Sequence, residues 1–214
     1  MFPPLYAIIH TAWLRRPELT FAAMMAESGV KLIQYRNKQI SSRELFRVLQ
    51  TLATQLVPRG IRLIVNDRPD IATLTGAGGV HVGQEDLPVE RARAICGATS
   101  WVGVSTHNLE QVREADSTSA DYLAIGPIFS TTTKQNSDPV VGIEFIRRAR
   151  AITRKPLVAI GGITLERAEE IFRAGADSIA VAQDLFTASD PAARAREYLE
   201  LACRVANLGI AARN

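Results

Sequence analysis

Short apolar runs alternate along this chain with longer amphipathic stretches. The runs are four to seven residues long and rich in Val, Ile and Leu. Such near-continuous hydrophobicity is typical of strands buried on both faces of a parallel sheet. The predicted strands are Leu5–His10, Val30–Arg36, Ile61–Val65, Gly79–Val82, Trp101–Val104, Tyr122–Ile125, Leu157–Ile160 and Ser178–Val181.

The segments between the runs carry signals of helix ends. Ser41 with Glu44 three residues later predicts a capping box, and Asp190 before Pro191 predicts a capped first turn. Repeated strand–helix units require parallel strands joined by crossover helices. An open, doubly wound sheet shares this local pattern, but no GxGxxG motif follows the first strand. We therefore predict an α/β fold, a single (β/α)8 barrel over residues 1–214 with no linker.

Composition narrows the possible classes of protein. Hydrophobic residues make up 47% and charged residues 22%, as in an ordinary globular domain, and the net charge of +3 is spread along the chain. No apolar run approaches the roughly 20 residues of a membrane helix, and the start does not resemble a signal peptide, so we expect a cytoplasmic protein without nucleic-acid or membrane partners. Cys96 and Cys203 lack metal-ligand spacing, and we expect Cys203 to fill the core beneath the last helix.

Polar residues follow the predicted strands, at the end of a barrel where active sites lie. After the second strand, alternation places Gln34, Arg36 and Lys38 on one side of the chain. An amide, a guanidinium and an ammonium aimed at one space suit a pyrophosphate. A solvated cluster of charges at a strand end is the plainer alternative.

Two carboxylates follow the third and fourth strands. Asp67 and Asp86 lie at adjacent strand ends and could share Mg²⁺, which often takes one or two protein carboxylates and completes its shell with phosphate and water. Alternatively, Asp67 caps the helix that begins near Pro69.

The later strand ends offer further groups for an anionic ligand. Ser105 could hydrogen-bond a ligand, and His107 is either an acid–base group or, more commonly at such a position, structural. The long loop after the sixth strand holds several hydroxyls and a lysine, which suits a lid. Gly161-Gly162 after the seventh strand and Ala182-Gln183 after the eighth lie where barrels frequently bind phosphate.

In combination and order, these motifs resemble those of the thiamine phosphate synthases, and they cover nearly the whole chain. The matching residues are Gln34-Tyr35-Arg36-Asn37-Lys38, Asn66-Asp67, Gly79-Val80-His81-Val82-Gly83-Gln84-Glu85-Asp86, Val102-Gly103-Val104-Ser105-Thr106-His107, Gly126-Pro127-Ile128-Phe129 with Thr131, Thr133 and Lys134, and Ile160-Gly161-Gly162-Ile163.

The resemblance implies a transferase of thiamine biosynthesis with two small-molecule substrates. These are 4-amino-2-methyl-5-hydroxymethylpyrimidine pyrophosphate and 4-methyl-5-(2-hydroxyethyl)thiazole phosphate. By that resemblance, the pyrimidine pyrophosphate would be held by Gln34, Arg36, Lys38, Asn66 and Lys134. Those expected to contribute to catalysis are Arg36, Lys38, Lys134 and Ser105.

The same resemblance implies roles for the remaining residues. Asp67 and Asp86 would bind Mg²⁺, Ser105 would contact the pyrimidine, and Gly162 would meet the thiazole phosphate. The residues expected to line the closing loop are Thr131 and Thr133.

The chain departs from the family pattern in two places. The first strand ends in Ile9-His10 where the family often has Thr-Asp, and Ala182-Gln183 replaces a small residue followed by serine. The bulk of Gln183 leaves open whether the thiazole phosphate site is preserved. Two alternative functions remain, a related thiazole tautomerase and a non-catalytic barrel that binds phosphorylated ligands. Neither oligomeric state nor the role of His81 follows from the sequence.

Overall fold

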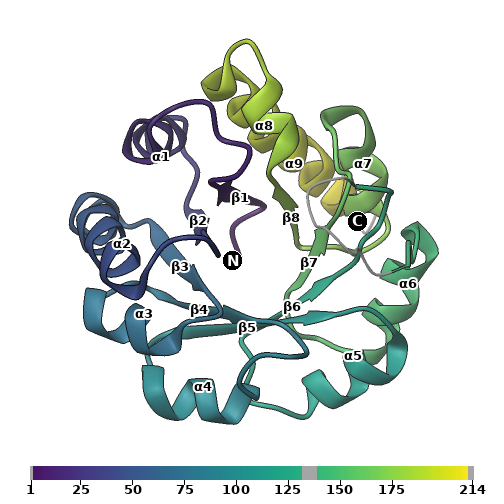
Figure 1. The fold of residues 1–214 in the computed structure, drawn as a ribbon. Coiled ribbons are helices and arrows are strands. Elements are labelled where there is room, and N and C mark those ends of the chain that lie inside the picture. Colours follow the sequence, from purple (N-terminus) through teal and green to yellow (C-terminus); the bar gives the residue numbers. More distant parts are fainter. Residues whose placement is uncertain (1, 132–138, 212–214) are drawn as a thin grey trace.

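Eight parallel strands close into a barrel surrounded by helices in the computed structural model, which describes residues 2–131 and 139–211 (Figure 1). This confirms the predicted (β/α)8 fold. The strands are β1 (Leu5–His10), β2 (Leu32–Arg36), β3 (Arg62–Asn66), β4 (Gly79–Val82), β5 (Trp101–Thr106), β6 (Tyr122–Ile125), β7 (Leu157–Ile160) and β8 (Ser178–Val181). The helices are α1 (Glu18–Glu27), α2 (Ser42–Leu56), α3 (Pro69–Thr75), α4 (Val89–Cys96), α5 (Leu109–Asp116), α6 (Ile143–Ile152), α7 (Leu165–Arg173), α8 (Gln183–Thr187) and α9 (Pro191–Ala211), with a 3-10 turn, η1 (Val57–Arg59).

Three strands have bounds that differ from the sequence prediction. Strands β2 and β3 begin later because the backbone N–H groups of Val30 and Ile61 donate back to the last turns of the preceding helices. Strand β5 extends further, since Ser105 and Thr106 pair with the end of β6.

The predicted helix caps are present, but one core prediction is wrong. The Ser41 side chain accepts from the Glu44 N–H, and the Glu44 carboxylate accepts from the Ser41 N–H, which completes the capping box. The Asp190 carboxylate accepts from two N–H groups of the first turn of α9. Cys203 is exposed rather than buried, because α9 packs with a different face, that of Tyr198 and Leu201.

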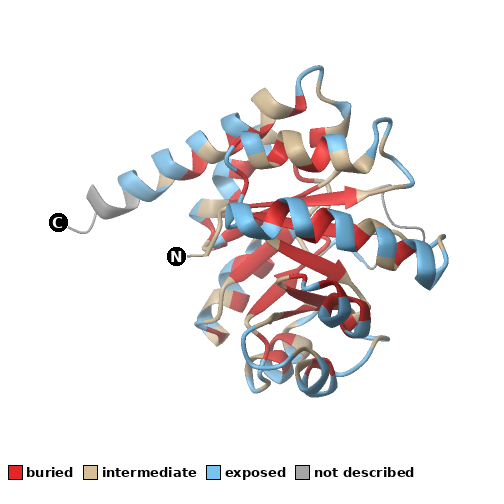
Figure 2. Ribbon diagram, turned by 90° about the vertical axis from the view of Figure 1, so that its left-hand side faces the viewer, coloured by how far each residue is buried: buried red, intermediate tan, exposed pale blue. Residues whose placement is uncertain are grey.

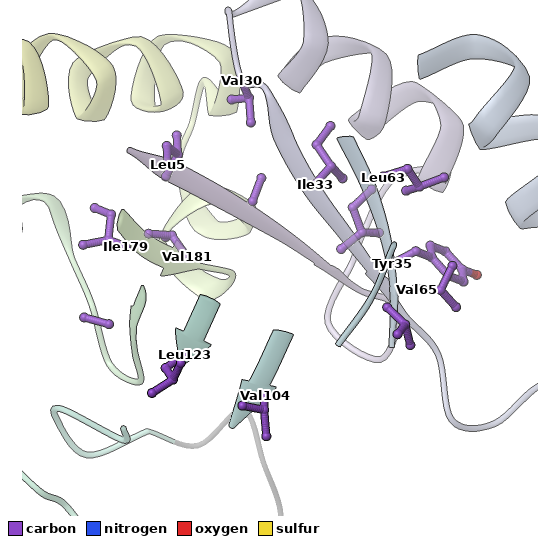
Figure 3. Close-up of a cluster of buried hydrophobic side chains, with 14 of the residues drawn as sticks. Leu5, Val30, Ile33, Tyr35, Leu63, Val65, Val104, Leu123, Ile179 and Val181 are labelled. Atoms are coloured by element: carbon purple, nitrogen blue, oxygen red, sulfur yellow. The ribbon is translucent and has the colours of Figure 1, made fainter. Parts of the chain in front are cut away.

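Alternate residues of each strand serve two different layers. Outward-facing side chains such as Ile33, Leu63 and Val104 pack beneath the helices and form the larger core (Figure 3). The strands are accordingly buried along most of their length (Figure 2). Burial of this face, at roughly 25 cal/mol per Å² of apolar surface, is the main stabilising contribution.

Inward-facing side chains divide the barrel interior into two halves. The amino-terminal half is apolar and aromatic, with Phe2 stacked on Trp101 at a centroid distance of 5.0 Å. Toward the carboxyl ends, the inward positions become polar. In the described part of the chain, no helix is long and apolar enough to cross a membrane.

Candidate active site

A cavity of about 880 Å³ lies at the carboxyl ends of the strands. Its volume is within the range of sites that bind small molecules. Every predicted site residue in the described part of the chain lines it: Gln34, Arg36, Lys38, Asn66, Asp67, Asp86, Ser105, Thr131, Gly162, Ala182 and Gln183. Thr133 and Lys134 lie outside the described residues.

Cationic side chains and their partners form one end of the cavity, above β2 and β3. Gln34 and Arg36 face inward because they alternate with Tyr35, which packs on the outer face. The Arg36 guanidinium donates to the Asn66 amide oxygen over 3.0 Å, and the Lys38 ammonium lies 2.7 Å from the Asp67 carboxylate. The Lys38 side chain is 56% exposed, so its ammonium can also reach a ligand in the cavity.

The two carboxylates predicted to share a cation lie side by side. Burial raises the pKa of the Asp86 carboxyl, and the neighbouring Asp67 carboxylate raises it further. The Gly83 N–H donates to Asp86 over 2.7 Å and opposes this rise. Two like charges held together in this way favour a shared proton or cation.

The alternative role for Asp67, as a helix cap, is wrong. Arg68 occupies the N-cap position of α3, and its side chain makes no capping hydrogen bond. Instead, Asp67 adopts a left-handed conformation, with φ of 63°, and its N–H donates to the carbonyl of His81. Aspartate tolerates this region better than most residues, and such conformations are common at functional sites.

The donor set is compatible with Mg²⁺. Two carboxylates from adjacent strand ends match the one or two protein carboxylates that Mg²⁺ commonly takes. Within the described residues, no group of three or more His, Cys, Asp or Glu side chains could hold a metal. A cation held by Asp67 and Asp86 would therefore need ligand oxygens and water to complete its shell.

The histidines on β4 and after β5 make hydrogen bonds within the protein. His81 contacts the Ser105 hydroxyl through Nε2 at 2.9 Å and the Tyr122 hydroxyl through Nδ1 at 3.0 Å. Burial lowers the pKa of His81 to about 4, so its ring is neutral near pH 7. The His107 Nδ1–H donates to the Gly126 carbonyl over 2.6 Å, which links the ends of β5 and β6.

The opposite end of the cavity, above β7 and β8, includes a tight glycine turn, Gly161-Gly162. Gly162 has φ of 61°, and a Cβ there would lie 2.4 Å from the Ser130 carbonyl oxygen and 2.8 Å from Phe129 Cβ. Only glycine fits this position. Arg167, in the first turn of α7, donates to the Gly162 carbonyl over 2.9 Å and lies 4.5 Å above the Phe129 ring, which supports the glycine turn.

Several cavity residues were not predicted from the sequence. His10 ends β1 beside Arg36, and both burial and the Arg36 charge lower the pKa of His10. Its position at the end of a predicted strand could have identified His10 as a candidate site residue. Arg167 lies within a helix and Tyr6 within a strand, so neither had a strand-end signal.

Together, the barrel and its charged cavity define an enzyme that acts on anionic small molecules at the carboxyl face of the strands. The chain belongs to the thiamine monophosphate synthase family, whose sequence profile (TMP-TENI) matches residues 5–185.

Relatives and a solved structure agree with this assignment. The chain is 48% identical over 204 residues to a thiamine-phosphate synthase of Koribacter versatilis, an alignment that covers 93% of this chain and 95% of the relative. It is 42% identical to a thiamine-phosphate synthase of Syntrophomonas wolfei, with 82% and 84% covered. A thiamine phosphate pyrophosphorylase from Pyrococcus furiosus superposes with a TM-score of 0.86 at 32% identity, covering 94% of this chain and 96% of that one.

Proposed function

We propose that the protein catalyses the thiamine phosphate synthase reaction. It would join 4-amino-2-methyl-5-hydroxymethylpyrimidine pyrophosphate to 4-methyl-5-(2-hydroxyethyl)thiazole phosphate and release pyrophosphate. The observation that carries this proposal is the convergence of Arg36, Lys38, Asp67 and Asp86 on one cavity, in a chain 48% identical to a thiamine-phosphate synthase.

The end above β2 and β3 is suited to the pyrophosphate. Arg36 and Lys38 supply positive charge, and the amides of Gln34 and Asn66 lie on the same wall of the cavity. The hydrogen bond from Arg36 to Asn66 holds the guanidinium in place before substrate binds. Preorganised donors of this kind stabilise charge that develops on a leaving group.

Asp67 and Asp86 would hold Mg²⁺ beside the pyrophosphate. When bound, the ion would supply positive charge that offsets both the paired carboxylates and the departing pyrophosphate. The raised pKa of the Asp86 carboxyl supports this role, because burial and, to a lesser extent, the neighbouring Asp67 disfavour its negative charge, which a cation would offset.

The reaction needs no protein nucleophile. The bond between the pyrimidine methylene and the pyrophosphate oxygen breaks, and its electron pair leaves with the pyrophosphate. The resulting cation is delocalised into the aminopyrimidine, and the thiazole nitrogen donates its lone pair to form the new C–N bond. The protein's part is alignment of two substrates and stabilisation of charge.

The other cavity residues would contact the pyrimidine, the thiazole phosphate or the loop that closes over them. Ser105 would contact the pyrimidine, and Thr131 would line the closing loop with Thr133 and Lys134, two residues outside the described part of the chain. Gly162 would meet the thiazole phosphate. The remaining residues proposed at that end are Ala182 and Gln183.

The cation cluster favours this reaction over the alternatives. A thiazole tautomerase handles one substrate and has no pyrophosphate to release, so it has no use for paired carboxylates beside Arg36 and Lys38. A barrel that only binds one phosphorylated ligand likewise has no use for two anion-binding subsites, one above β2 and β3 and the other above β7 and β8.

The deciding experiment is a product assay with both substrates. Purified protein with Mg²⁺ should form thiamine phosphate and pyrophosphate, and EDTA should abolish the reaction until excess Mg²⁺ restores it. Absence of product with both substrates and Mg²⁺ would overturn the proposed function. Product formation that resists chelation would overturn the Mg²⁺ assignment alone.

A further inference from the structure

A chain of hydrogen bonds crosses the barrel interior beneath the cavity. The Gln34 Nε2 donates to the Tyr6 hydroxyl over 2.8 Å, and the Tyr6 and Tyr122 hydroxyls lie 3.0 Å apart. From Tyr122 the chain continues to His81 Nδ1 at 3.0 Å, and from His81 Nε2 to the Ser105 hydroxyl at 2.9 Å. It therefore joins Gln34 on β2 to Ser105 on β5 through Tyr6, Tyr122 and His81, of which Tyr6 and His81 also line the floor of the cavity.

The direction of the chain follows from counting hydrogens. A tyrosine hydroxyl has one hydrogen to donate. Tyr6 is 1% exposed and already accepts from Gln34, so its own hydrogen has Tyr122 as its acceptor. In the reverse direction Tyr6 would accept twice and leave its hydrogen unpaired away from water, which costs about 1–3 kcal/mol.

The same counting fixes the histidine tautomer. Tyr122 accepts from Tyr6 and so donates its hydrogen to Nδ1 of His81. The neutral ring must then carry its hydrogen on Nε2, which donates to the Ser105 oxygen. Ser105 thus accepts from within the protein, and its own hydroxyl hydrogen remains for a group in the cavity that it lines.

We propose that Tyr6, Tyr122 and His81 are positioning residues that set the direction of this chain, so that Ser105 presents a hydrogen-bond donor to the substrate. The matching ligand chemistry is an acceptor, such as an unprotonated ring nitrogen. That the acceptor belongs to the pyrimidine substrate rests on the proposed function; the direction of the chain does not.

Packing holds the chain in this geometry. A Cβ on Gly103 would lie 2.0 Å from the Tyr122 ring, so β5 has space for that ring only because this position is glycine. The His81 ring stacks on Tyr122 at a centroid distance of 5.5 Å, and Tyr6 meets Tyr122 edge-on at 5.9 Å. Rings fixed on both sides have no freedom to exchange hydrogen-bond partners.

Nitrogen NMR of the histidine side chains in the intact protein tests the direction without any substrate. The chain has only three histidines, so a His81→Gln variant identifies the His81 signals by their loss. We expect a protonated, pyrrole-like Nε2 and an unprotonated, pyridine-like Nδ1 near pH 7. A hydrogen on Nδ1, or on both nitrogens, would overturn the proposal even if the product assay succeeds.

Tyr122→Phe tests the consequence for the substrate. It removes the hydrogen bond to Nδ1, so we expect the single tautomer to be lost and kcat/KM for the pyrimidine pyrophosphate to fall about tenfold. The KM for the thiazole phosphate should stay unchanged. The matched control is Tyr35→Phe, which loses a buried hydroxyl bonded to Glu18 at 3.0 Å on the outer face of the same barrel.

Thermal unfolding of both variants separates this role from a general loss of stability. The proposal would be overturned if Tyr122→Phe kept the wild-type tautomer of His81 and had the same kinetics as Tyr35→Phe. If Tyr122→Phe does not fold, the NMR result on the unsubstituted protein still decides the direction of the chain.

Discussion

The two ends of the cavity are built differently. Above β2–β4, charged and amide side chains converge, and they are already paired: Arg36 with Asn66, and Lys38 with Asp67. Above β7 and β8, a glycine turn with no side chain at Gly162 shapes the wall, and the Arg167 side chain lines the same end. In the proposed reaction each end faces a phosphorylated group. Only the end above β2–β4 faces a group whose charge changes during the reaction, the leaving pyrophosphate.

This contrast explains why the two ends differ in composition. A leaving pyrophosphate gains charge, so donors and a cation placed beside it lower the barrier. The thiazole phosphate keeps its charge throughout and needs only a fixed position, which backbone N–H groups and a helix start can provide. Substitutions at the first end should therefore affect kcat, and those at the second should affect KM for one substrate.

The largest expected effect is at the charged end. Arg36→Ala removes a guanidinium and leaves Asn66 without its partner, so we expect kcat/KM for the pyrimidine pyrophosphate to fall on the order of 10³-fold, mostly in kcat. Steady-state kinetics with each substrate varied in turn measures this. Arg43→Ala, on the exposed face of α2, is the matched control and should retain full activity. A change confined to the thiazole phosphate KM would contradict the division between the two ends.

A smaller and differently distributed effect is expected at the backbone end. Gly162→Ala places a Cβ against the Ser130 carbonyl, which must displace the turn, and we expect KM for the thiazole phosphate to rise about tenfold or more with little change for the other substrate.

The control for this prediction is Gly76→Ala. Gly76 has φ of 68°, close to that of Gly162, but a Cβ there meets nothing within 4 Å. Both variants should lose about 1 kcal/mol of stability through backbone strain, with a further loss in Gly162→Ala from the clash with Ser130, and only Gly162→Ala should alter KM. Equal kinetics for the two variants would show that shape at Gly162 does not matter for binding.

The outer layer of the barrel could be predicted from the sequence, and the inner layer only in part. Residues such as Ile33 and Val104 lie in apolar runs, and burial beneath helices follows directly from that pattern. The proximity of Asp67 and Asp86 was predictable too, because each follows one of two adjacent strands.

Contacts across the barrel interior could not be predicted in the same way. Tyr6 and Tyr122 occur in apolar runs and look like ordinary core residues, yet their hydroxyls meet across a sequence separation of 116 residues. Which inward side chains meet depends on strand tilt and stagger, which periodicity does not encode. The exposure of Cys203 was missed for a related reason, since the rotation of α9 is set by what it packs against.

The smallest expected effect concerns stability at the charged end. The pKa of the Asp86 carboxyl is raised in the folded protein, so the folded state binds that proton more tightly than the unfolded chain does. Below the ordinary aspartate pKa both states are protonated and stability is unaffected. As pH rises from the ordinary aspartate pKa through the raised one, the folded state acquires an unfavourable buried charge, and the loss of stability is complete above the raised pKa.

Asp86→Asn should therefore stabilise the metal-free protein at neutral pH, with a rise in Tm on the order of 2 °C that disappears in acid. Asp70→Asn is the opposite control: its ion pair with Arg68 lowers the pKa of Asp70, so removing that charge should leave Tm unchanged or slightly lower. Added Mg²⁺ should raise the Tm of the unsubstituted protein and of Asp70→Asn, but not of Asp86→Asn, because a ligand stabilises only a state that binds it. If Mg²⁺ raised the Tm of all three proteins equally, the cation would bind elsewhere. The charged end would then owe its affinity for anions to Arg36 and Lys38 alone.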